Sequence, residues 1–141
     1  MRLSNLLAIF AFAGTVSAAP KINEIMFHPA GALEDTSKEW IELYNADASA
    51  TNMSGWTFTK GISYTIPQGT SIPAGGYVVV AANPTAFLAA YPGFSGTVIG
   101  GWTGRLSNSG EQIQLDDELG DKVVDVTYAD EGDWGLRARG R

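Results

Sequence analysis

Apolar residues in this chain occur in short runs, and most of these runs end at Gly, Pro, Asn or Asp. Runs of about five residues that end in this way are typical of β-strands. Several of them alternate with polar residues, so Ile62, Tyr64 and Ile66 share one face, as do Ile41 and Leu43. The pattern predicts strands at 22–27, 40–44, 56–58, 62–66, 77–81, 113–115 and 123–128.

The run 77–80 is apolar on both faces, which predicts a central strand that is buried on both sides. Turns are predicted where Pro comes early and Gly late, at 66–69 and 72–76, and two more at 107–110 and 118–121. One short helix is expected near residues 84–91, because Asn83 can cap it and Pro84 suits its first position. Many short strands with frequent turns indicate an all-β sandwich.

The first residues have the features of an export signal. A single positive charge at Arg2 precedes an apolar run over 6–14, and small residues follow at 16–18. We therefore expect a signal peptide at 1–18, cleavage after Ala18, and a secreted or extracytoplasmic protein with no membrane attachment after cleavage. The alternative is a short N-terminal anchor, although the apolar run is too short to cross a hydrocarbon core of about 30 Å.

Composition limits the partners and the stabilising chemistry. The formal net charge of −6 makes nucleic acid a poor partner, because phosphate backbones repel an acidic surface. The chain has no cysteine, so an exported form would depend on its hydrophobic core or on bound ions rather than on disulfides.

Seven motifs with a fixed order and spacing carry a family resemblance. They are INEIMFHP at 22–29, EWIELYN at 39–45, MSGW at 53–56, IPQGT at 66–70, IPAGGY at 72–77, LSNSGE at 106–111 and VVDVTY at 123–128. Together they make residues 21–134 similar to the lamin tail domain family, in particular to its bacterial exported members. The resemblance implies an immunoglobulin-like β-sandwich without catalytic activity, of a kind found within larger secreted or surface proteins.

The resemblance also gives an expectation about the end of the chain. The family's sandwich usually continues with further residues, whereas this chain has no additional strand-like run after residue 134. We therefore interpret 135–141 as a truncated C-terminal segment of a longer protein and expect one sheet edge to be unpaired. An open edge invites pairing with other strands.

The first two motifs contain a candidate site, formed by His28 with Glu24, Glu39 and Glu42. These residue types suit a metal centre or acid–base chemistry. A transition-metal site normally uses several His or Cys ligands, and this chain has one His and no Cys. The favoured interpretation is that His28 ends the first strand and that Glu24 and Glu42 hydrogen-bond locally.

A second candidate is the acidic group Asp116, Asp117, Glu118 and Asp121, at a predicted hairpin turn. Clustered carboxylates suit calcium, but the spacing does not follow the EF-hand pattern. Two such charges about 4 Å apart repel by only about 1 kcal/mol in water. A solvated turn without a cofactor is therefore the favoured interpretation, and calcium is the alternative.

The tryptophans form a third group of candidates. Trp40 and Trp56 lie in strand patterns and are predicted to be core residues. Trp102 lies in a glycine-rich stretch beside Arg105 and Asn108, where an exposed ring would stack on a sugar or anchor a protein. Packing over the end of the sandwich is the favoured interpretation for Trp102. Trp134 is expected to lie near the truncated end.

Catalytic motifs are absent from the sequence: it has no G-x-S-x-G elbow, no phosphate-binding glycine loop and no Cys–His pair. The leading hypothesis is a non-catalytic binding or assembly module that attaches an exported protein to a protein or cell-surface component. One alternative is a module that targets polysaccharide through Trp102. Another is a domain appended to a larger secreted enzyme or kinase-like protein.

Overall fold

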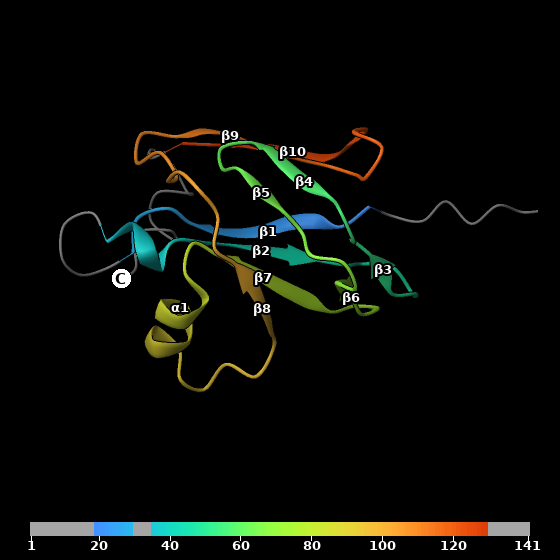
Figure 1. Cartoon of the computed structure of the whole chain (residues 1–141), viewed down its shortest axis with the longest axis horizontal. Helices are drawn as coiled ribbons and strands as arrows, with labels where there is room; N and C mark the ends of the chain where they lie inside the picture. Colours follow the sequence, from blue (N-terminus) through green and yellow to red (C-terminus); the bar gives the residue numbers. More distant parts are fainter. Residues whose placement is uncertain (1–18, 30–34, 130–141) are drawn as a thin grey trace, which may run out of the picture.

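The computed structural model describes residues 19–29 and 35–129, which form two facing β-sheets (Figure 1). The first sheet has the strand order β1-β2-β7-β8 and the second the order β10-β9-β4-β5. A small pair, β3-β6, lies at one end of the sandwich (Figure 1). The strands are β1 (Lys21–Met26), β2 (Trp40–Tyr44), β3 (Thr51–Asn52), β4 (Thr57–Lys60), β5 (Tyr64–Thr65), β6 (Ser71–Ile72), β7 (Tyr77–Ala81), β8 (Thr97–Gly100), β9 (Glu111–Asp116) and β10 (Lys122–Tyr128).

The main core fills the space between the two sheets. Ile41 and Leu43 of β2 contribute to it from one sheet, and Phe58, Ile113 and Leu115 contribute from the other. These side chains come from alternate positions of their strands, as expected when one face of each sheet is buried. The prediction of an all-β, immunoglobulin-like sandwich is confirmed.

Strand β7 is buried on both faces over residues 78–81, as its sequence predicts, but its first residue, Tyr77, is exposed. Val78 and Val80 belong to the core between the sheets, whereas Val79 packs on the opposite face with Phe87. Phe87 comes from helix α1 (Pro84–Ala90), which covers part of the outer face of the first sheet (Figure 1). The helix prediction is also confirmed, because the Asn83 side chain accepts a hydrogen bond from the N–H of Ala86 at 3.1 Å.

Strands β2 and β7 begin and end where the sequence predicts, but other boundaries differ. The run 62–66 is a strand only at Tyr64–Thr65. Three strands were not predicted, namely β3, β6 and β8, because the first two have two residues each and β8 lies in a glycine-rich stretch. A short 3-10 helix, η1 (Thr36–Lys38), precedes β2 and was not predicted either.

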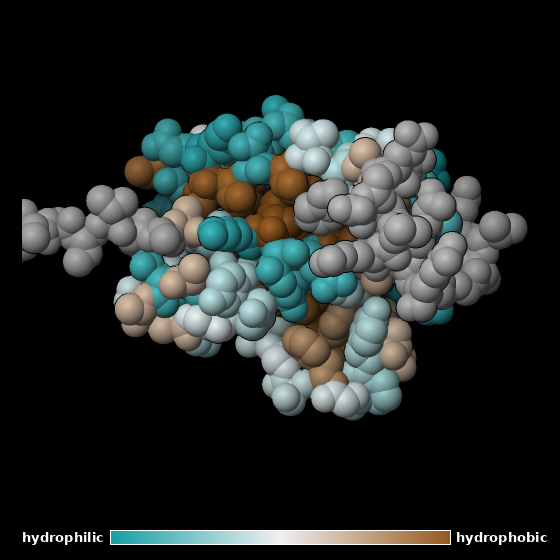
Figure 2. Space-filling view, turned by 180° about the vertical axis from the view of Figure 1, so that it is seen from behind, coloured by the Kyte–Doolittle hydropathy of each residue, from teal (hydrophilic) through white to brown (hydrophobic). Residues whose placement is uncertain are grey.

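One side of the sandwich exposes apolar surface. Strands β1 and β10 are edge strands of the two sheets, and they contact each other. Ile22 of β1 and Val124 and Val126 of β10 pack against the core but are only partly buried. Figure 2 shows apolar surface between two hydrophilic bands of the molecule. We refer to Ile22, Val124 and Val126 as the edge seam.

Within the described part of the chain, no helix is long and apolar enough to cross a membrane. The predicted signal peptide at 1–18 lies outside the described residues.

Candidate functional site

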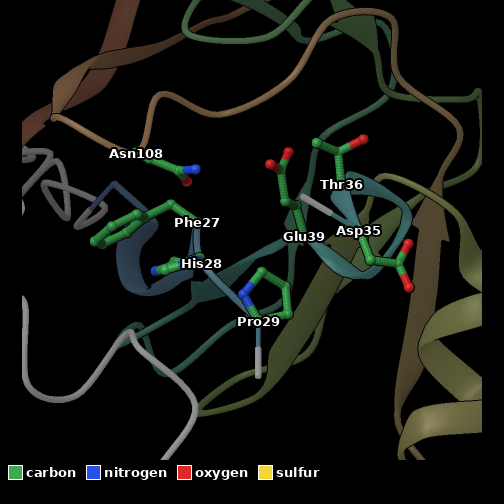
Figure 3. A pocket seen from close by; sticks show the side chains of 7 residues that line it. All are labelled: Phe27, His28, Pro29, Asp35, Thr36, Glu39 and Asn108. Carbon is green, nitrogen blue, oxygen red and sulfur yellow. The ribbon is translucent and has the colours of Figure 1, made fainter. Parts of the chain in front are cut away.

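A small hollow lies where the end of β1 meets η1 and the loop before β9 (Figure 3). Its volume is about 210 Å³, open space included. Because that figure includes open solvent, the enclosed part is far smaller than the roughly 300–1,000 Å³ of sites for small organic ligands. The hollow therefore suits water or a single small group of a partner. It is lined by Phe27, His28, Pro29, Asp35, Thr36, Glu39 and Asn108.

Glu39 is the distinctive residue of this hollow, because its carboxyl group is almost completely buried, with 2% of the residue exposed. In Figure 3 its side chain lies between Thr36 and Asn108. One carboxyl oxygen, Oε2, accepts a hydrogen bond from the N–H of Leu106 at 2.9 Å. Burial raises the pKa of Glu39 from 4.5 to about 7, against the lowering effect of that hydrogen bond. Glu39 therefore changes charge near neutral pH.

A second carboxylate, Glu111, holds the same loop from the other sheet. Its Oε1 accepts hydrogen bonds from the N–H of Ser107 at 2.7 Å and from the hydroxyl of Tyr128 at 3.0 Å. The Tyr128 hydroxyl also lies 2.7 Å from the Ser107 carbonyl, so its single proton has two acceptors. Burial, together with the Glu111 charge, raises the pKa of Tyr128. The Tyr128 ring stacks on Phe27, with centroids 4.8 Å apart. These contacts tie the loop to both sheets.

The candidate cluster of His28 with three glutamates, which the sequence did not favour, does not form among the described residues. His28 is exposed and lines the hollow with Glu39. Glu24 and Glu42 lie instead on β1 and β2 and are directly opposite each other in the register. The Asn23 amide donates a hydrogen bond to Glu42 at 2.7 Å, which confirms the predicted local hydrogen bonding of Glu42. Strand alternation separates Glu39 from Glu42, because side chains three residues apart point to opposite faces of the sheet.

The acidic hairpin residues do not converge on a common point either. Asp116 is buried, and its two oxygens accept hydrogen bonds from Thr59 Oγ1 and Gln114 Nε2, each at 2.7 Å. Glu118 accepts a hydrogen bond from Trp56 Nε1 at 3.0 Å. The prediction of a solvated turn is thus wrong for Asp116, which is enclosed by the sheet.

The other two acids of this group shape the turn itself. Asp117 Oδ1 accepts hydrogen bonds from the N–H groups of Leu119 and Asp121, both at 2.9 Å. Such side-chain to backbone bonds are a general way in which Asp stabilises a turn. Among residues 19–29 and 35–129, no three His, Cys, Asp or Glu side chains are arranged to hold a metal ion.

Trp102 is buried, with 7% exposed, and belongs to the core between the sheets. The favoured prediction that it packs is confirmed, and the hypothesis of an exposed stacking ring at this position is wrong because the indole is directed inward. Arg105 and Asn108 are exposed, and Asn108 lines the hollow. Trp40 and Trp56 are buried as predicted. Trp134 lies outside the described residues.

The sequence patterns did not single out the aromatic pair formed by Tyr44 of β2 and Tyr77 of β7. These residues are directly opposite each other, with ring centroids 4.7 Å apart and planes inclined by 30°. Tyr77 has 47% of its surface exposed. The alternation of side chains along β2 places Tyr44 on the same face as Glu42. Which residue of β7 lies next to Tyr44 depends on the strand order and register, which the sequence patterns do not give.

Comparison with known protein families supports the fold and the motif pattern together. The model described as Lamin Tail Domain matches residues 14–130, a range that includes every strand from β1 to β10. No curated protein matches the chain.

Proposed function

The chain belongs to the lamin tail domain family, and from this premise we propose that it is a binding or assembly module of an exported protein. The family's domains are immunoglobulin-like and non-catalytic. In our proposal the module attaches the exported protein to a protein or cell-surface component. The observation that carries this proposal is the pair of edge strands β1 and β10.

Both strands have a side available for pairing. Within the described residues, β1 pairs only with β2 and β10 pairs only with β9. The free side of each strand has backbone N–H and C=O groups that can hydrogen-bond to an added strand. The edge seam lies beside these groups and provides apolar contacts for alternate side chains of that strand. An extended segment of a partner protein matches both features.

A non-catalytic role agrees with the chemistry of the hollow. Glu39 has a pKa of about 7, which is suitable for a general base, but its hydrogen bond goes to the backbone of Leu106 and not to a nucleophile. The nearby carboxylate of Glu111 likewise binds the Ser107 backbone and the Tyr128 hydroxyl. These groups hold the loop in place.

The N-terminal pattern supports export in this proposal. A charged first segment, an apolar run and small residues before Ala18 are the features recognised by signal peptidases. The net charge of −6 agrees with a protein or surface partner better than with nucleic acid.

The proposal is tested by site-specific photo-crosslinking of the full chain in its native host. A photoreactive amino acid replaces Thr127 on β10 or Asn23 on β1, and in the control it replaces Leu119, a residue of the β9–β10 turn with 81% exposure. We expect the edge positions to crosslink one defined protein or surface component that the control position does not. Equal labelling at all three positions, or no labelling at the edges, would contradict the proposal.

A further inference from the structure

The outer face of the first sheet is divided into a covered half and an uncovered half. Alternation places Trp40, Glu42 and Tyr44 of β2 on this face, since Ile41 and Leu43 point into the core between the sheets. Helix α1 packs on the Trp40 end through Phe87, and their rings lie 6.0 Å apart in an edge-to-face arrangement. The helix therefore covers one end of this face.

The uncovered half contains the Tyr44–Tyr77 pair. In the register, Tyr77 is the first residue of β7, and β8 begins beside Val78 with Thr97. No residue of β8 therefore lies beside Tyr77, on the side away from Tyr44. This position explains the 47% exposure of Tyr77, since one side of its ring is free of strand neighbours. A tyrosine ring presented in this way can contact a ligand.

Two carboxylates adjoin this aromatic pair. Glu42 lies two residues before Tyr44 on the same face, and Glu24 is directly opposite Glu42 on β1. Partial burial raises the pKa of Glu24, and the charge of Glu42 raises it further. Neither carboxylate forms an ion pair within the described residues. Like charges directly opposite each other destabilise a sheet, so this arrangement has a cost in the unbound protein.

A positively charged residue, Lys21 of β1, also lies near these side chains, because it is opposite Tyr44 in the register. Lys21 lies at the opposite end of the β1–β2 pair from Met26 and Trp40. Tyr44 lies between Lys21 and Tyr77, so Lys21 is not next to the exposed side of the Tyr77 ring. The uncovered half thus combines two aromatic rings and two carboxylates with one lysine at its margin. We call Glu24, Glu42, Tyr44 and Tyr77 the tyrosine face.

We propose that the tyrosine face binds a cationic side chain, lysine or arginine, of a polypeptide partner. A positive group above a tyrosine ring is attracted by the ring's quadrupole, and the neighbouring carboxylates pair with the same charge. The acidic charge of the whole chain favours the approach of such a partner. This surface is on a different side of the first sheet from the edge seam, so the inference does not depend on strand addition.

The test is an NMR titration of the full chain with a short peptide in which Arg alternates with Ser. A peptide with Gln in place of each Arg is the ligand control. We expect the Arg peptide to shift backbone signals around Tyr77 and Glu42, and the Gln peptide to leave them unchanged. Added salt is expected to weaken the binding, because both contacts are electrostatic.

Matched variants separate this site from a general attraction to an acidic protein. Tyr77→Thr keeps a good strand former and is expected to weaken binding about two- to fivefold, as is Glu42→Gln. Asp121→Asn removes a negative charge at the β9–β10 turn, away from this face, and is expected to bind like the wild type. Lys21→Ala is expected to bind about twice as tightly, because a competing cation is removed.

Spectra of each variant without peptide establish that it is folded, so that a loss of binding is assigned to the surface. Equal weakening by Glu42→Gln and Asp121→Asn would show non-specific attraction and overturn the inference. Unchanged binding by Tyr77→Thr would overturn it as well. Shifts around Tyr77 with soluble oligosaccharides, in the absence of shifts with the Arg peptide, would assign the face to sugars and reject the cationic partner.

Discussion

At the scale of single residues, Glu39 holds the loop before β9 against the start of β2 through a carboxyl group whose charged form is expensive to bury. Its carboxyl oxygen holds the N–H of Leu106, and with 2% exposure it has little contact with water. Because burial raises its pKa from 4.5 to about 7, the folded protein binds a proton more tightly than the unfolded chain in that interval. The free energy of unfolding contributed by this group is therefore highest below pH 4.5 and decreases as the pH rises through about 7.

This gives a prediction for Glu39→Gln. The amide oxygen still accepts the Leu106 hydrogen bond, but the side chain no longer titrates, so the variant should be more stable than the wild type at pH 8 by roughly 2–3 kcal/mol. At pH 4 the two proteins should differ by less than about 1 kcal/mol. Urea unfolding at the two pH values measures this difference. Asp121→Asn is the control, and parallel pH profiles for wild type and Glu39→Gln would contradict the prediction.

Residue-scale roles were predicted most directly where the strand pattern fixes which face a side chain lies on. Trp40 and Trp56 are core residues for this reason. The roles of Glu39 and Trp102 depend on segments that are distant in sequence, since Glu39 bonds to Leu106 and Trp102 enters a core built by both sheets. Composition and local spacing contain no information about those contacts. The same is true of Tyr77, whose neighbour Tyr44 is set by the register.

At the scale of elements, the connection after β8 depends on a glycine. Gly100 has φ of 147°, and a Cβ atom at this position would lie 1.8 Å from the carbonyl oxygen of Ala81 on the adjacent strand β7. Its neighbour Gly101 also has positive φ, 91°, but a Cβ there would have no atom within 4 Å. An alanine at Gly101 would therefore introduce backbone strain alone, whereas an alanine at Gly100 would introduce backbone strain and a steric clash.

We predict that Gly100→Ala destabilises the protein much more than Gly101→Ala. The collision in Gly100→Ala forces β7 and β8 apart and should cost more than about 3 kcal/mol, whereas Gly101→Ala should cost roughly 1 kcal/mol from positive φ alone. Thermal unfolding followed by circular dichroism measures both. Similar losses of stability for the two variants would mean that β8 does not pair with β7 as described.

The strands show how much of the fold follows from sequence. Long apolar or alternating runs such as β2 and β7 were located to the residue, because burial imposes a period that the sequence displays. Helix α1 was located through its cap and its proline. In contrast, β3 and β6 have two residues each and are held by pairing with each other, which leaves no period to detect. The parallel pairing of β8 with β7 likewise comes from tertiary structure.

At the scale of the whole molecule, the sandwich combines a net negative charge with a core that contains no disulfide. The chain has fifteen Asp and Glu against nine Lys and Arg, giving −6, and no cysteine. The ion pairs Lys38–Asp35 and Lys122–Asp125 both lie at the surface and contribute little stability. The excess of negative over positive charges opposes the compact state by repulsion.

Screening this repulsion should stabilise the protein. Raising sodium chloride from about 0.02 M to about 0.2 M shortens the Debye length from roughly 20 Å to 7 Å, so carboxylates on different strands interact less. We expect the melting temperature at pH 8 to rise by a few degrees, with a smaller rise at pH 5, where Glu39 is neutral and the repulsion is weaker. Calorimetry in the two salt concentrations checks this. A melting temperature that falls with salt at pH 8 would mean that favourable ion pairs, rather than repulsion among acids, dominate the electrostatic energy of the sandwich.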